Sequence, residues 1–510
     1  MRKGDILEGT IESYDFPNKG SLYIGDRKVT IKGTLPGQKV RFMVTKRKSG
    51  MAEGRLLEVL EKSPLEDSEP SCPYFGMCGG CTYQNLSVEN QLKLKEDMVK
   101  KLLAPAVNDS LKKNPDWRGE TIDNMWEGII SSPEIKGYRN KMEFTFGDEY
   151  KDGPLALGLH KKGGFYDILN VTKCEIITPD WGKILEYTLE YFKEKAVPFY
   201  HKMRHIGVLR NLVIRQSKAT GEFLINLVAS TQWEDFMSTK AGAENGNIAE
   251  AVVAKDVMSD ENYPGKSIVE EYAAGLVELT AKEGFSGSIG GILYTENDSL
   301  GDVVQSDRTI LLYGNDYIVE EVMGLKFQIS PFSFFQTNTK GCQVLYSKAR
   351  EYIMSTASPD KIVFDLYSGT GTIAQMMAPA SKKVIGIEIV EEAVEAAKEN
   401  AKLNGLDNCE FIAGDVLKAI DLVEDKPDLI ILDPPRDGIN PKALDKILAF
   451  GVEEMVYISC KPSSLARDLR IITDRGYRVK SLCAIDQFPG TVHCESLCLL
   501  EKVSLDTEPL

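Results

Sequence analysis

The sequence predicts a multidomain protein with a small N-terminal β-barrel, a central α+β domain and a C-terminal α/β domain built on a doubly wound sheet. The chain has 510 residues, and because single hydrophobic cores stop growing near ~250–300 residues, one core cannot serve it. Residues 1–62 are short alternating apolar runs between turn residues, and from about residue 341 buried strands alternate with amphipathic helices. We therefore expect domains at 1–62, 63–330 and 331–510.

The N-terminal barrel is expected to be of the five-stranded OB type, which often binds nucleic acid. In residues 1–62, Lys and Arg outnumber Asp and Glu by five. A solvated strand edge is the plain alternative, but such crowding on one strand and its turn favours nucleic-acid binding. The crowded residues are Lys39, Arg41, Lys46, Arg47 and Lys48.

Two segments around the central domain carry little structural signal. The Pro- and acid-rich stretch at residues 62–71 has the composition of a linker. Residues 235–265 are acidic, rich in Ala and Asn and weakly periodic, so we expect a surface insertion there.

Composition excludes several classes of protein. The N-terminus has no apolar run of signal-peptide length, and no stretch reaches the ~18 apolar residues of a membrane span, so we expect a cytoplasmic protein that does not contact membranes. The formal net charge of −15 argues against non-specific coating of nucleic acid, although it leaves a local RNA-binding patch open. We expect a monomer.

The first strand of the C-terminal domain ends in the motif DLYSGTGT, which contains Gly369 and Gly371. Glycines at a strand's carboxyl end let the backbone approach a ligand. Glu388 ends the next strand, where a carboxylate can bind ribose hydroxyls, and Asp415 ends the third, within reach of an adenine amino group. Each acid taken singly could instead cap a helix. Since Ala374 replaces the third glycine of a dinucleotide motif, S-adenosylmethionine fits better.

Two further strand ends carry reactive groups. The fourth strand ends in Asp433-Pro434-Pro435-Arg436, and the fifth ends at Cys460, followed by Lys461 and the start of a helix. A cysteine there is often merely structural, but Lys461 and the helix start should favour its thiolate. A thiolate that adds to C6 of uracil makes C5 nucleophilic, and a base must then remove the C5 proton. Glu495 is the candidate base, with an exposed strand carboxylate as the alternative.

The motifs DLYSGTGT, IEIVEEAVEAAKENAKLNG, LDPPRDG, ISCKP, HCES and SPFSFFQTN together resemble the family of RNA uracil-5-methyltransferases. The resemblance implies a Rossmann-like class I methyltransferase domain and identifies residues 4–61 with that family's TRAM barrel. It also implies that Cys460 is the nucleophile, that Glu495 is the proton acceptor, and that S-adenosylmethionine is held by Gln336, Tyr367, Gly369, Glu388, Asp415 and Asp433. Two departures concern substrate detail: Lys461 stands where the family commonly has asparagine, and the 235–265 segment is longer than usual.

Cys72, Cys78 and Cys81 supply three thiols on a Gly-rich loop. Their spacing admits zinc or iron–sulfur. Cys174 is the only other cysteine in the N-terminal half, so position selects it as the fourth ligand. The family resemblance favours a [4Fe-4S] cluster on these four residues.

The family members that join a TRAM barrel to such a cluster resemble enzymes acting on 23S ribosomal RNA, so C5 methylation of a uridine in that RNA is the leading hypothesis. A tRNA uracil methyltransferase is the second, and a non-catalytic iron–sulfur RNA-binding protein is a third. Amino-methylating enzymes typically carry Asn-Pro-Pro where this chain has Asp433-Pro434-Pro435. The candidate RNA contacts are Tyr138, Arg139, Asn140, Lys141, Arg210 and Arg215.

Overall fold

The fold is described from a computed structural model, which places residues 1–112, 119–164, 166–234, 236, 262–282, 284–301, 306–355 and 359–503. The chain divides into two compact units. The first unit contains residues 1–71, 81–135 and 340–510, and the second contains residues 72–80 and 136–339. No described helix is both long and apolar enough to cross a lipid bilayer. The expected insertion at 235–265 lies outside the described residues, apart from residues 236 and 262–265.

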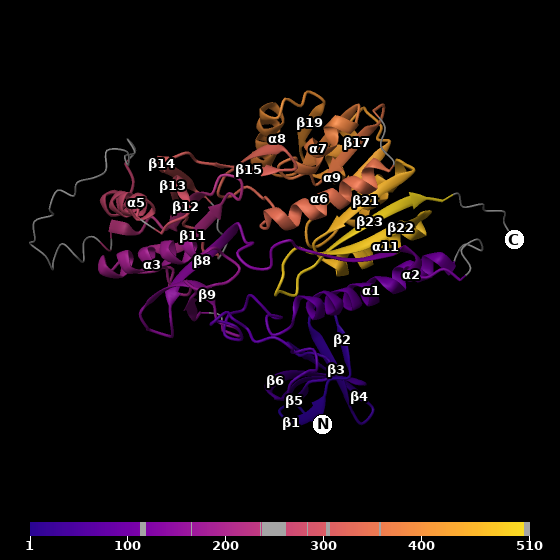
Figure 1. Ribbon diagram of the computed structural model, residues 1–510, viewed down its shortest axis with the longest axis horizontal. Coiled ribbons are helices and arrows are strands. Elements are labelled where there is room, and N and C mark those ends of the chain that lie inside the picture. Colours follow the sequence, from indigo (N-terminus) through magenta and orange to yellow (C-terminus); the bar gives the residue numbers. More distant parts are fainter. Residues whose placement is uncertain are drawn as a thin grey trace, which may run out of the picture. The chain divides into compact units, whose positions relative to one another are not determined.

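The N-terminal residues form a curled six-stranded sheet, one strand more than expected, drawn in indigo at the bottom of Figure 1. β1 and β2 stand at the two ends of the strand order yet are separated only by Ile11 and Glu12. Because Ile11 N bonds to Gln38 O and Glu12 N to Ser21 O, this bent segment closes the sheet into a barrel. The strands are β1 (Ile6–Thr10), β2 (Ser13–Asp15), β3 (Lys19–Ile24), β4 (Arg27–Lys32), β5 (Lys39–Lys48) and β6 (Met51–Glu61).

The stretch after the barrel is not the loose linker expected from its composition. Glu66 accepts hydrogen bonds from the side chains of Gln38 and Asn85, and Asp67 accepts bonds from Ser87 N and the Asn90 side chain. These carboxylates therefore tie the barrel to the start of helix α1 (Val88–Lys112). The composition predicted a linker because acidic residues are common in solvated segments, but the same carboxylates can also accept hydrogen bonds from backbone and side-chain amide N–H groups.

The C-terminal part of the first unit is a doubly wound sheet with the strand order β19-β18-β17-β20-β21-β23-β22-β7. Strands β17 to β21 are parallel, whereas β23 runs antiparallel to β21 and β22. The predicted α/β fold is confirmed. Its strands are β17 (Ile362–Leu366), β18 (Lys383–Glu388), β19 (Cys409–Ala413), β20 (Leu429–Leu432), β21 (Glu454–Ser459), β22 (Tyr477–Asp486) and β23 (Glu495–Lys502).

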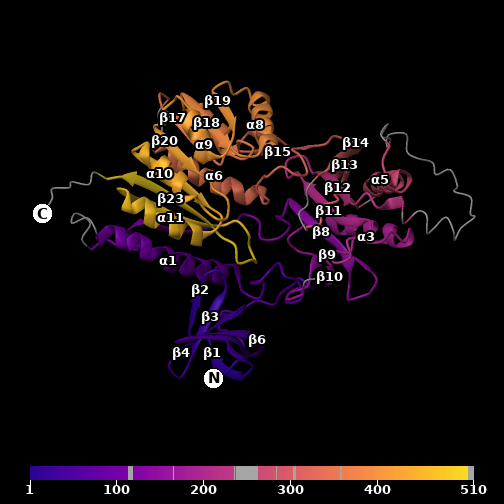
Figure 2. The same ribbon diagram turned by 180° about the vertical axis from the view of Figure 1, so that it is seen from behind.

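An eighth strand, β7 (Trp126–Ser131), comes from the N-terminal half and pairs in parallel with β22. Helix α1 joins the same core, where Val99, Leu103 and Val107 pack with residues of the sheet. Figures 1 and 2 both show α1 beside α11 (Pro462–Asp474), with which it is in contact. The remaining helices of this part are α2 (Ile122–Met125), α6 (Thr339–Met354), α7 (Thr372–Met377), α8 (Glu391–Leu403), α9 (Val416–Ala419) and α10 (Pro441–Ala449).

The second unit is an α+β structure with the strand order β10-β9-β8-β11-β12-β13-β14 and a separate β15-β16 hairpin. Its core is aromatic, because Phe144 and Phe223 pack edge-on against Trp181. The elements are β8 (Lys141–Asp148), β9 (Leu155–His160), β10 (Ile168–Asn170), α3 (Pro179–Glu194), β11 (Leu209–Gln216), β12 (Glu222–Ala229), α5 (Lys266–Thr280), β13 (Ser288–Glu296), β14 (Arg308–Gly314), β15 (Ile318–Val322) and β16 (Leu325–Ile329).

Candidate active site

The glycine-rich loop follows β17 and turns sharply into α7. Tyr367, Gly369 and Gly371 all adopt positive φ angles, of 67°, 54° and 72°. A Cβ on Gly371 would lie 2.6 Å from the ring of Phe411, so only glycine fits there. Beneath the loop, Asp365 Oδ2 accepts a hydrogen bond of 2.9 Å from Ala374 N and so fixes the start of α7.

Glu388 stands at the end of the adjacent strand and is joined to this loop. Its Oε2 accepts a hydrogen bond of 3.0 Å from Gly369 N, and its Oε1 accepts one of 3.0 Å from Val390 N. A hollow next to it is lined by Ile389, Val390, Ala413 and Gly414, among others. Ile389 is 64 % exposed although it is apolar. Ile389 was assigned no role from the sequence. Its position directly after Glu388, the carboxylate at the end of the strand, is the feature that could have pointed to it.

Asp415 follows β19 and caps helix α9, with Oδ1 accepting a hydrogen bond of 2.8 Å from Leu417 N. The helix-cap alternative therefore holds for this residue. The cap also holds the carboxylate near Tyr367, whose pKa is raised to about 12 by burial and by the charge of Asp415.

Asp433 directly follows β20 and is partly buried. Its pKa is raised to about 8 by burial and by the charges of Glu495 and Glu388. Asp365, two strand positions from the loop, has a pKa raised to about 8 by burial and by the charge of Asp433. Ionising all of these neighbouring carboxyl groups costs free energy, so the site favours binding of a positively charged group.

Cys460 and Glu495 meet at the same edge of the sheet. The β21–β23 pairing ends with Ser459 opposite Ser496, so one further step in register sets Cys460 opposite Glu495. Glu495 is 3 % exposed. Burial raises the pKa of Glu495 to about 7, and burial with the charges of Glu495 and Asp433 raises the pKa of Cys460 to about 12.

The expectation that Lys461 favours the thiolate is wrong. Lys461 Nζ points to Asp437, at 3.9 Å. The cation that lowers the pKa of both Cys460 and Glu495 is Arg436, although burial outweighs it in each case. Arg436 Nη2 lies 3.2 Å from His493 Nδ1. Neither residue was assigned a role from the sequence, although both stand inside the motifs LDPPRDG and HCES.

The remaining predicted cofactor residue, Gln336, belongs to the second unit, where its main-chain oxygen accepts a hydrogen bond of 2.9 Å from Asn140 Nδ2. Thus Tyr367, Gly369, Glu388, Asp415 and Asp433 share the first unit with Cys460 and Glu495.

All ten cysteines lie in the described part of the chain, and none forms a disulfide. Cys72, Cys78 and Cys174 belong to the second unit and Cys81 to the first. Cys78 Sγ accepts a hydrogen bond of 3.4 Å from Gly80 N. Tyr74 OH accepts one of 3.2 Å from Lys173 N, which brings the loop beside the residue before Cys174. Among the described residues, no three His, Cys, Asp or Glu side chains are grouped as metal ligands.

Three of the six expected RNA contacts, Tyr138, Arg210 and Arg215, are buried or bonded within the protein. Arg210 donates to the carbonyl oxygens of Asn297, Ser299 and Gly301, and Arg215 donates to those of Pro331 and Ser333. Tyr138 is fully buried. The alternation of apolar and polar residues along a strand does not predict that a buried arginine will donate hydrogen bonds to the carbonyl oxygens of a loop.

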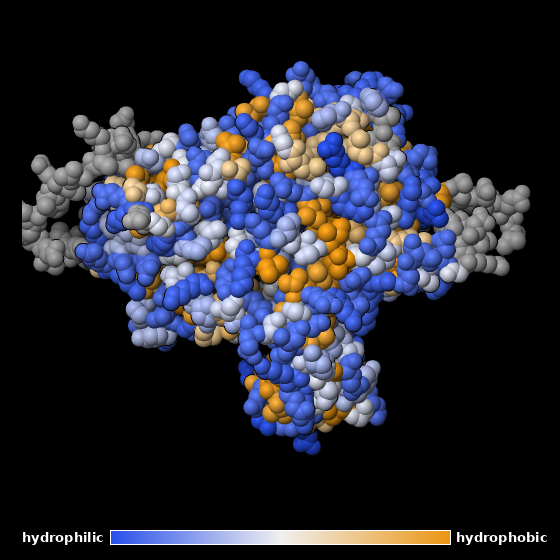
Figure 3. All heavy atoms as spheres, viewed as in Figure 1, coloured by the Kyte–Doolittle hydropathy of each residue, from blue (hydrophilic) through white to orange (hydrophobic). Residues whose placement is uncertain are grey.

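Charge pairing also reduces the basic patch of the barrel. Lys39 pairs with Glu61, Arg41 with Glu8 and Glu58, and Lys46 with Glu53. Arg47 and Lys48 are exposed and form no ion pair with any described residue. Figure 3 shows apolar side chains among the hydrophilic ones on the barrel at the bottom of the view, and its exposed apolar residues include Ile6, Tyr23 and Leu57.

Comparison with known proteins shows which family the chain is similar to. Residues 300–503 match the family model described as tRNA (Uracil-5-)-methyltransferase. An uncharacterized RNA methyltransferase of Caldanaerobacter subterraneus subsp. tengcongensis is 47% identical over 98% of this chain and 100% of its own length. A second from Clostridium tetani is 44% identical over 98% of this chain and 99% of its own.

The fold has a solved counterpart. The crystal structure of Pyrococcus abyssi tRNA (uracil-54, C5)-methyltransferase in complex with S-adenosyl-L-homocysteine is similar with a TM-score of 0.68 and 23% identity, covering 97% of this chain and 100% of that one. At that identity the likeness concerns the fold. The matches together place the chain among the RNA methyltransferases that use S-adenosylmethionine. Within that class, it belongs to the RNA uracil-5-methyltransferase family.

Proposed function

We propose that this protein methylates C5 of a uridine in 23S ribosomal RNA through a covalent adduct between Cys460 and C6 of the base. The observation that carries the proposal is that Cys460 and Glu495 come one step past the last β21–β23 pair, Ser459 and Ser496, with the charge of Glu495 acting on Cys460. Asp433, which acts on the pKa of Cys460, stands at the same sheet edge. A methyl transfer to a heteroatom needs no such pair of nucleophile and base.

The chain's residues divide the reaction between them. Cys460 first gives up its thiol proton to solvent, and Sγ then forms a bond to C6, which leaves the electron pair of the C5–C6 double bond on C5 as an enolate. S-adenosylmethionine, when bound, supplies the methyl group that C5 takes up. Glu495 then removes the C5 proton, the C5–C6 double bond re-forms, and Cys460 leaves as a thiolate. The cofactor would be held by Gln336, Tyr367, Gly369, Glu388, Asp415 and Asp433.

The raised pKa values suit this order of events. With a pKa raised to about 12, Cys460 is a thiol in the unliganded protein at pH 7, so the nucleophile stays unreactive until RNA and a cationic cofactor enter. Glu495, with a pKa raised to about 7, is a better proton acceptor than an ordinary carboxylate. Arg436 can stabilise negative charge on the base ring, because its charge already acts on both residues.

The choice of 23S ribosomal RNA rests on the resemblance to family members that combine a TRAM barrel with four cysteines. A tRNA substrate is the alternative, since the solved relative of the same fold acts on tRNA. We expect the protein to act as a cytoplasmic monomer.

We further propose a [4Fe-4S] cluster on Cys72, Cys78, Cys81 and Cys174. The donor set is chemically suitable, since all four ligands are thiols and Gly80 N already donates to Cys78 Sγ, as is common around iron–sulfur clusters. The reaction itself transfers no electron, so we assign the cluster a structural role or one in placing RNA.

The experiment that tests the function is methyl transfer in vitro, with labelled S-adenosylmethionine offered to unmodified 23S ribosomal RNA and to unmodified tRNA. Label in 5-methyluridine of 23S RNA is the expected result. Label in tRNA alone would replace the substrate, and label in neither would leave a non-catalytic RNA-binding protein as the better description. Mass mapping of ribosomal RNA from cells that lack the protein would then name the uridine.

A further inference from the structure

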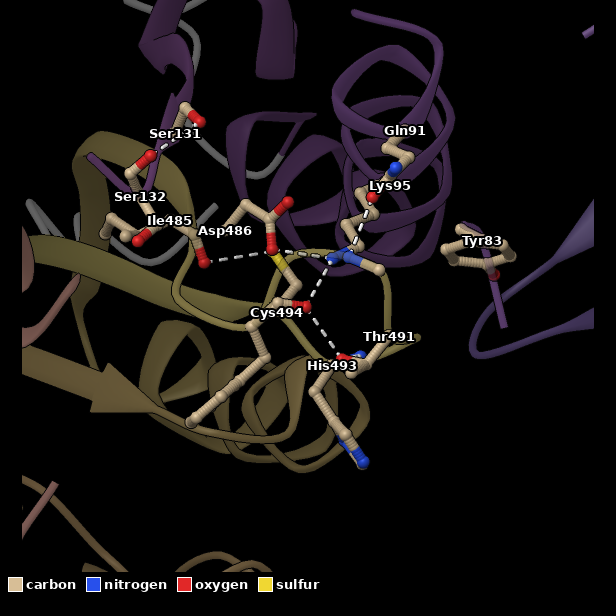
Figure 4. A network of polar contacts seen from close by, with 12 residues as sticks. Tyr83, Gln91, Lys95, Ser131, Ser132, Ile485, Asp486, Thr491, His493 and Cys494 are labelled. Atoms are coloured by element: carbon tan, nitrogen blue, oxygen red, sulfur yellow. Dashed lines mark hydrogen bonds and ion pairs between the residues drawn. The ribbon is translucent and has the colours of Figure 1, made fainter. Parts of the chain in front are cut away.

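The loop of residues 487–494 connects β22 to β23 and ends directly at Glu495. A catalytic carboxylate at the first residue of a strand depends on this loop for its position. The loop is held by a segment almost 400 residues earlier in the sequence, namely residues 82–95, which precede and begin helix α1 (Figure 4).

Lys95 makes the first of these contacts. Its side chain is fully buried, and Nζ lies 2.6 Å from Asp486 Oδ1 and 3.2 Å from Phe488 O. Asp486, whose side chain is 3 % exposed, directly follows Ile485, the residue that pairs with Glu495 across β22 and β23. A buried ammonium needs its partner, so the pair fixes the start of the loop next to the base.

Gly490 makes the second contact, at the middle of the loop. Its N donates a hydrogen bond of 2.8 Å to Gln91 Oε1, and its O accepts bonds of 2.7 Å from Thr82 N and 2.9 Å from Tyr83 N. Gln91 and Lys95 lie one helical turn apart on α1, so one face of this helix binds the loop at both points. In Figure 4 both side chains lie on α1 close to the loop, and Lys95 reaches Asp486.

We propose that Lys95 and Gln91 are positioning residues for Glu495, which set the rate of C5 proton removal without taking part in thiol addition. The inference rests on the proposed function. Cys460 lies between β21 and α11, outside the loop, whereas Glu495 begins where the loop ends. Loosening the loop therefore misplaces the base more than the nucleophile.

The test compares two steps in single-turnover reactions of the full-length protein. Methyl incorporation from labelled S-adenosylmethionine reports the first step, and tritium release from RNA carrying 5-tritiated uridine reports proton removal. The variants are Lys95→Met and Gln91→Leu. Because a displacement of about 1 Å can cost a hundredfold in rate, we expect tritium release to slow by at least about tenfold and methyl incorporation by less than about threefold. A protein–RNA adduct stable to denaturing gels should accumulate.

Lys101→Met is the matched control. Lys101 lies on the same helix but binds the barrel, through Tyr14 O and Asp15. It should leave both steps unchanged. Lys95→Met leaves Asp486 as a buried unpaired charge and can fail to fold for that reason. The double variant Lys95→Met/Asp486→Asn buries no charge, and Gln91→Leu removes no charge. Both of these variants should still show the selective loss of proton removal.

A merely structural role predicts a different result, namely equal losses in both steps in proportion to the folded fraction, with no adduct. That result overturns the inference. Failure of the proposed function is told apart by the unmutated protein: if it gives neither methyl incorporation nor an adduct with 5-fluorouridine RNA, the covalent mechanism is wrong, and the positioning role is overturned with it.

Discussion

Cys460 and Glu495 stand one residue past the end of an antiparallel pairing: β21 and β23 are paired up to Ser459 and Ser496, and these two residues come next on either side. Residues opposite each other within such a pairing have Cβ atoms about 4.5–5.5 Å apart, and side chains one step past its end also lie close, because the charge of Glu495 acts on the pKa of Cys460. This closeness suits the proposed mechanism, in which a uracil ring lies over both side chains, Cys460 attacks C6 and Glu495 takes the proton from C5.

The two residues should fail at different steps. Cys460→Ala should form neither adduct nor product, because thiol addition comes first. Glu495→Gln keeps the shape but cannot take the proton, so methylated RNA should stay attached, and turnover should fall by a factor on the order of 10²–10⁴. The measurement is a protein–RNA band on a denaturing gel that requires S-adenosylmethionine. Normal turnover by Glu495→Gln would show that another residue is the base.

Cofactor binding should depend on pH through Asp433. The pKa of this carboxyl is raised to about 8, so it is mostly protonated at pH 6.5 and ionises as the pH rises through 8. A cationic cofactor prefers the ionised form, so S-adenosylmethionine should bind more tightly at pH 8.5 than at pH 6.5, with protons released on binding at the lower pH. Calorimetry in buffers of different ionisation heat measures both. Asp433→Asn should flatten the dependence, and a flat profile in the unmutated protein would contradict the assignment.

Stability should respond to pH through Asp365. Its folded-state pKa is raised to about 8, while that of the unfolded chain lies near ~3.9. Between these values the folded state holds a proton that the unfolded state has lost, so this group's contribution to stability falls as pH rises. Asp365→Asn removes that loss. Its stability relative to the unmutated protein should therefore rise between pH 5 and pH 8 by on the order of 1–3 kcal/mol. Urea unfolding at the two pH values checks this, and a relative stability that does not change with pH would contradict it.

Anaerobically purified protein should be brown and contain about four irons per chain, as a four-thiolate site requires. Replacement of Cys72, Cys78, Cys81 or Cys174 by serine should bleach it, whereas Cys409→Ser, on β19, is a control that should not. Metal analysis with the visible spectrum decides. A colourless protein that carries zinc would exclude the cluster.

RNA binding should depend on Arg47 and Lys48 more than on the paired cations of the same strand. Arg47→Glu/Lys48→Glu should weaken RNA binding and reduce the slope of log affinity against log salt by about 1–2, because two phosphate contacts are lost. Lys39→Gln is the control, since Lys39 already pairs with Glu61. Binding of S-adenosylmethionine should not change in either variant. Equal RNA affinity before and after the double replacement would place the RNA elsewhere.

The sequence predicts the α/β fold and the ends of its strands because both depend on local patterns. Gly371 indicates a sharp turn, and Glu388 and Asp433 each come at the end of a buried apolar strand. Strand-end position is enough to bring such residues to one edge. By contrast, the contacts of Lys461 and Arg436 depend on side-chain direction, which residue order does not specify, and this is why the wrong cation was assigned to Cys460.

Contacts between residues far apart in the sequence could not be predicted either. Nothing near Lys95 signals a partner 391 positions away, and an isolated lysine on a helix ordinarily faces solvent. The same holds for β7, whose pairing with β22 joins residues more than 350 positions apart. Non-local contacts of this kind leave no periodic trace in a single sequence.

β7 and α1 also decide how the gene can be divided. A fragment beginning near residue 331 would lack the outermost strand of its sheet and the helix that covers part of its core, so it would expose an unpaired strand edge beside apolar surface and would aggregate. Residues 331–510 therefore cannot be cut out as an independent domain and fused to an RNA-binding protein. Any fragment that keeps this sheet complete must include residues 81–135, and therefore also Cys81 of the Gly-rich cysteine loop.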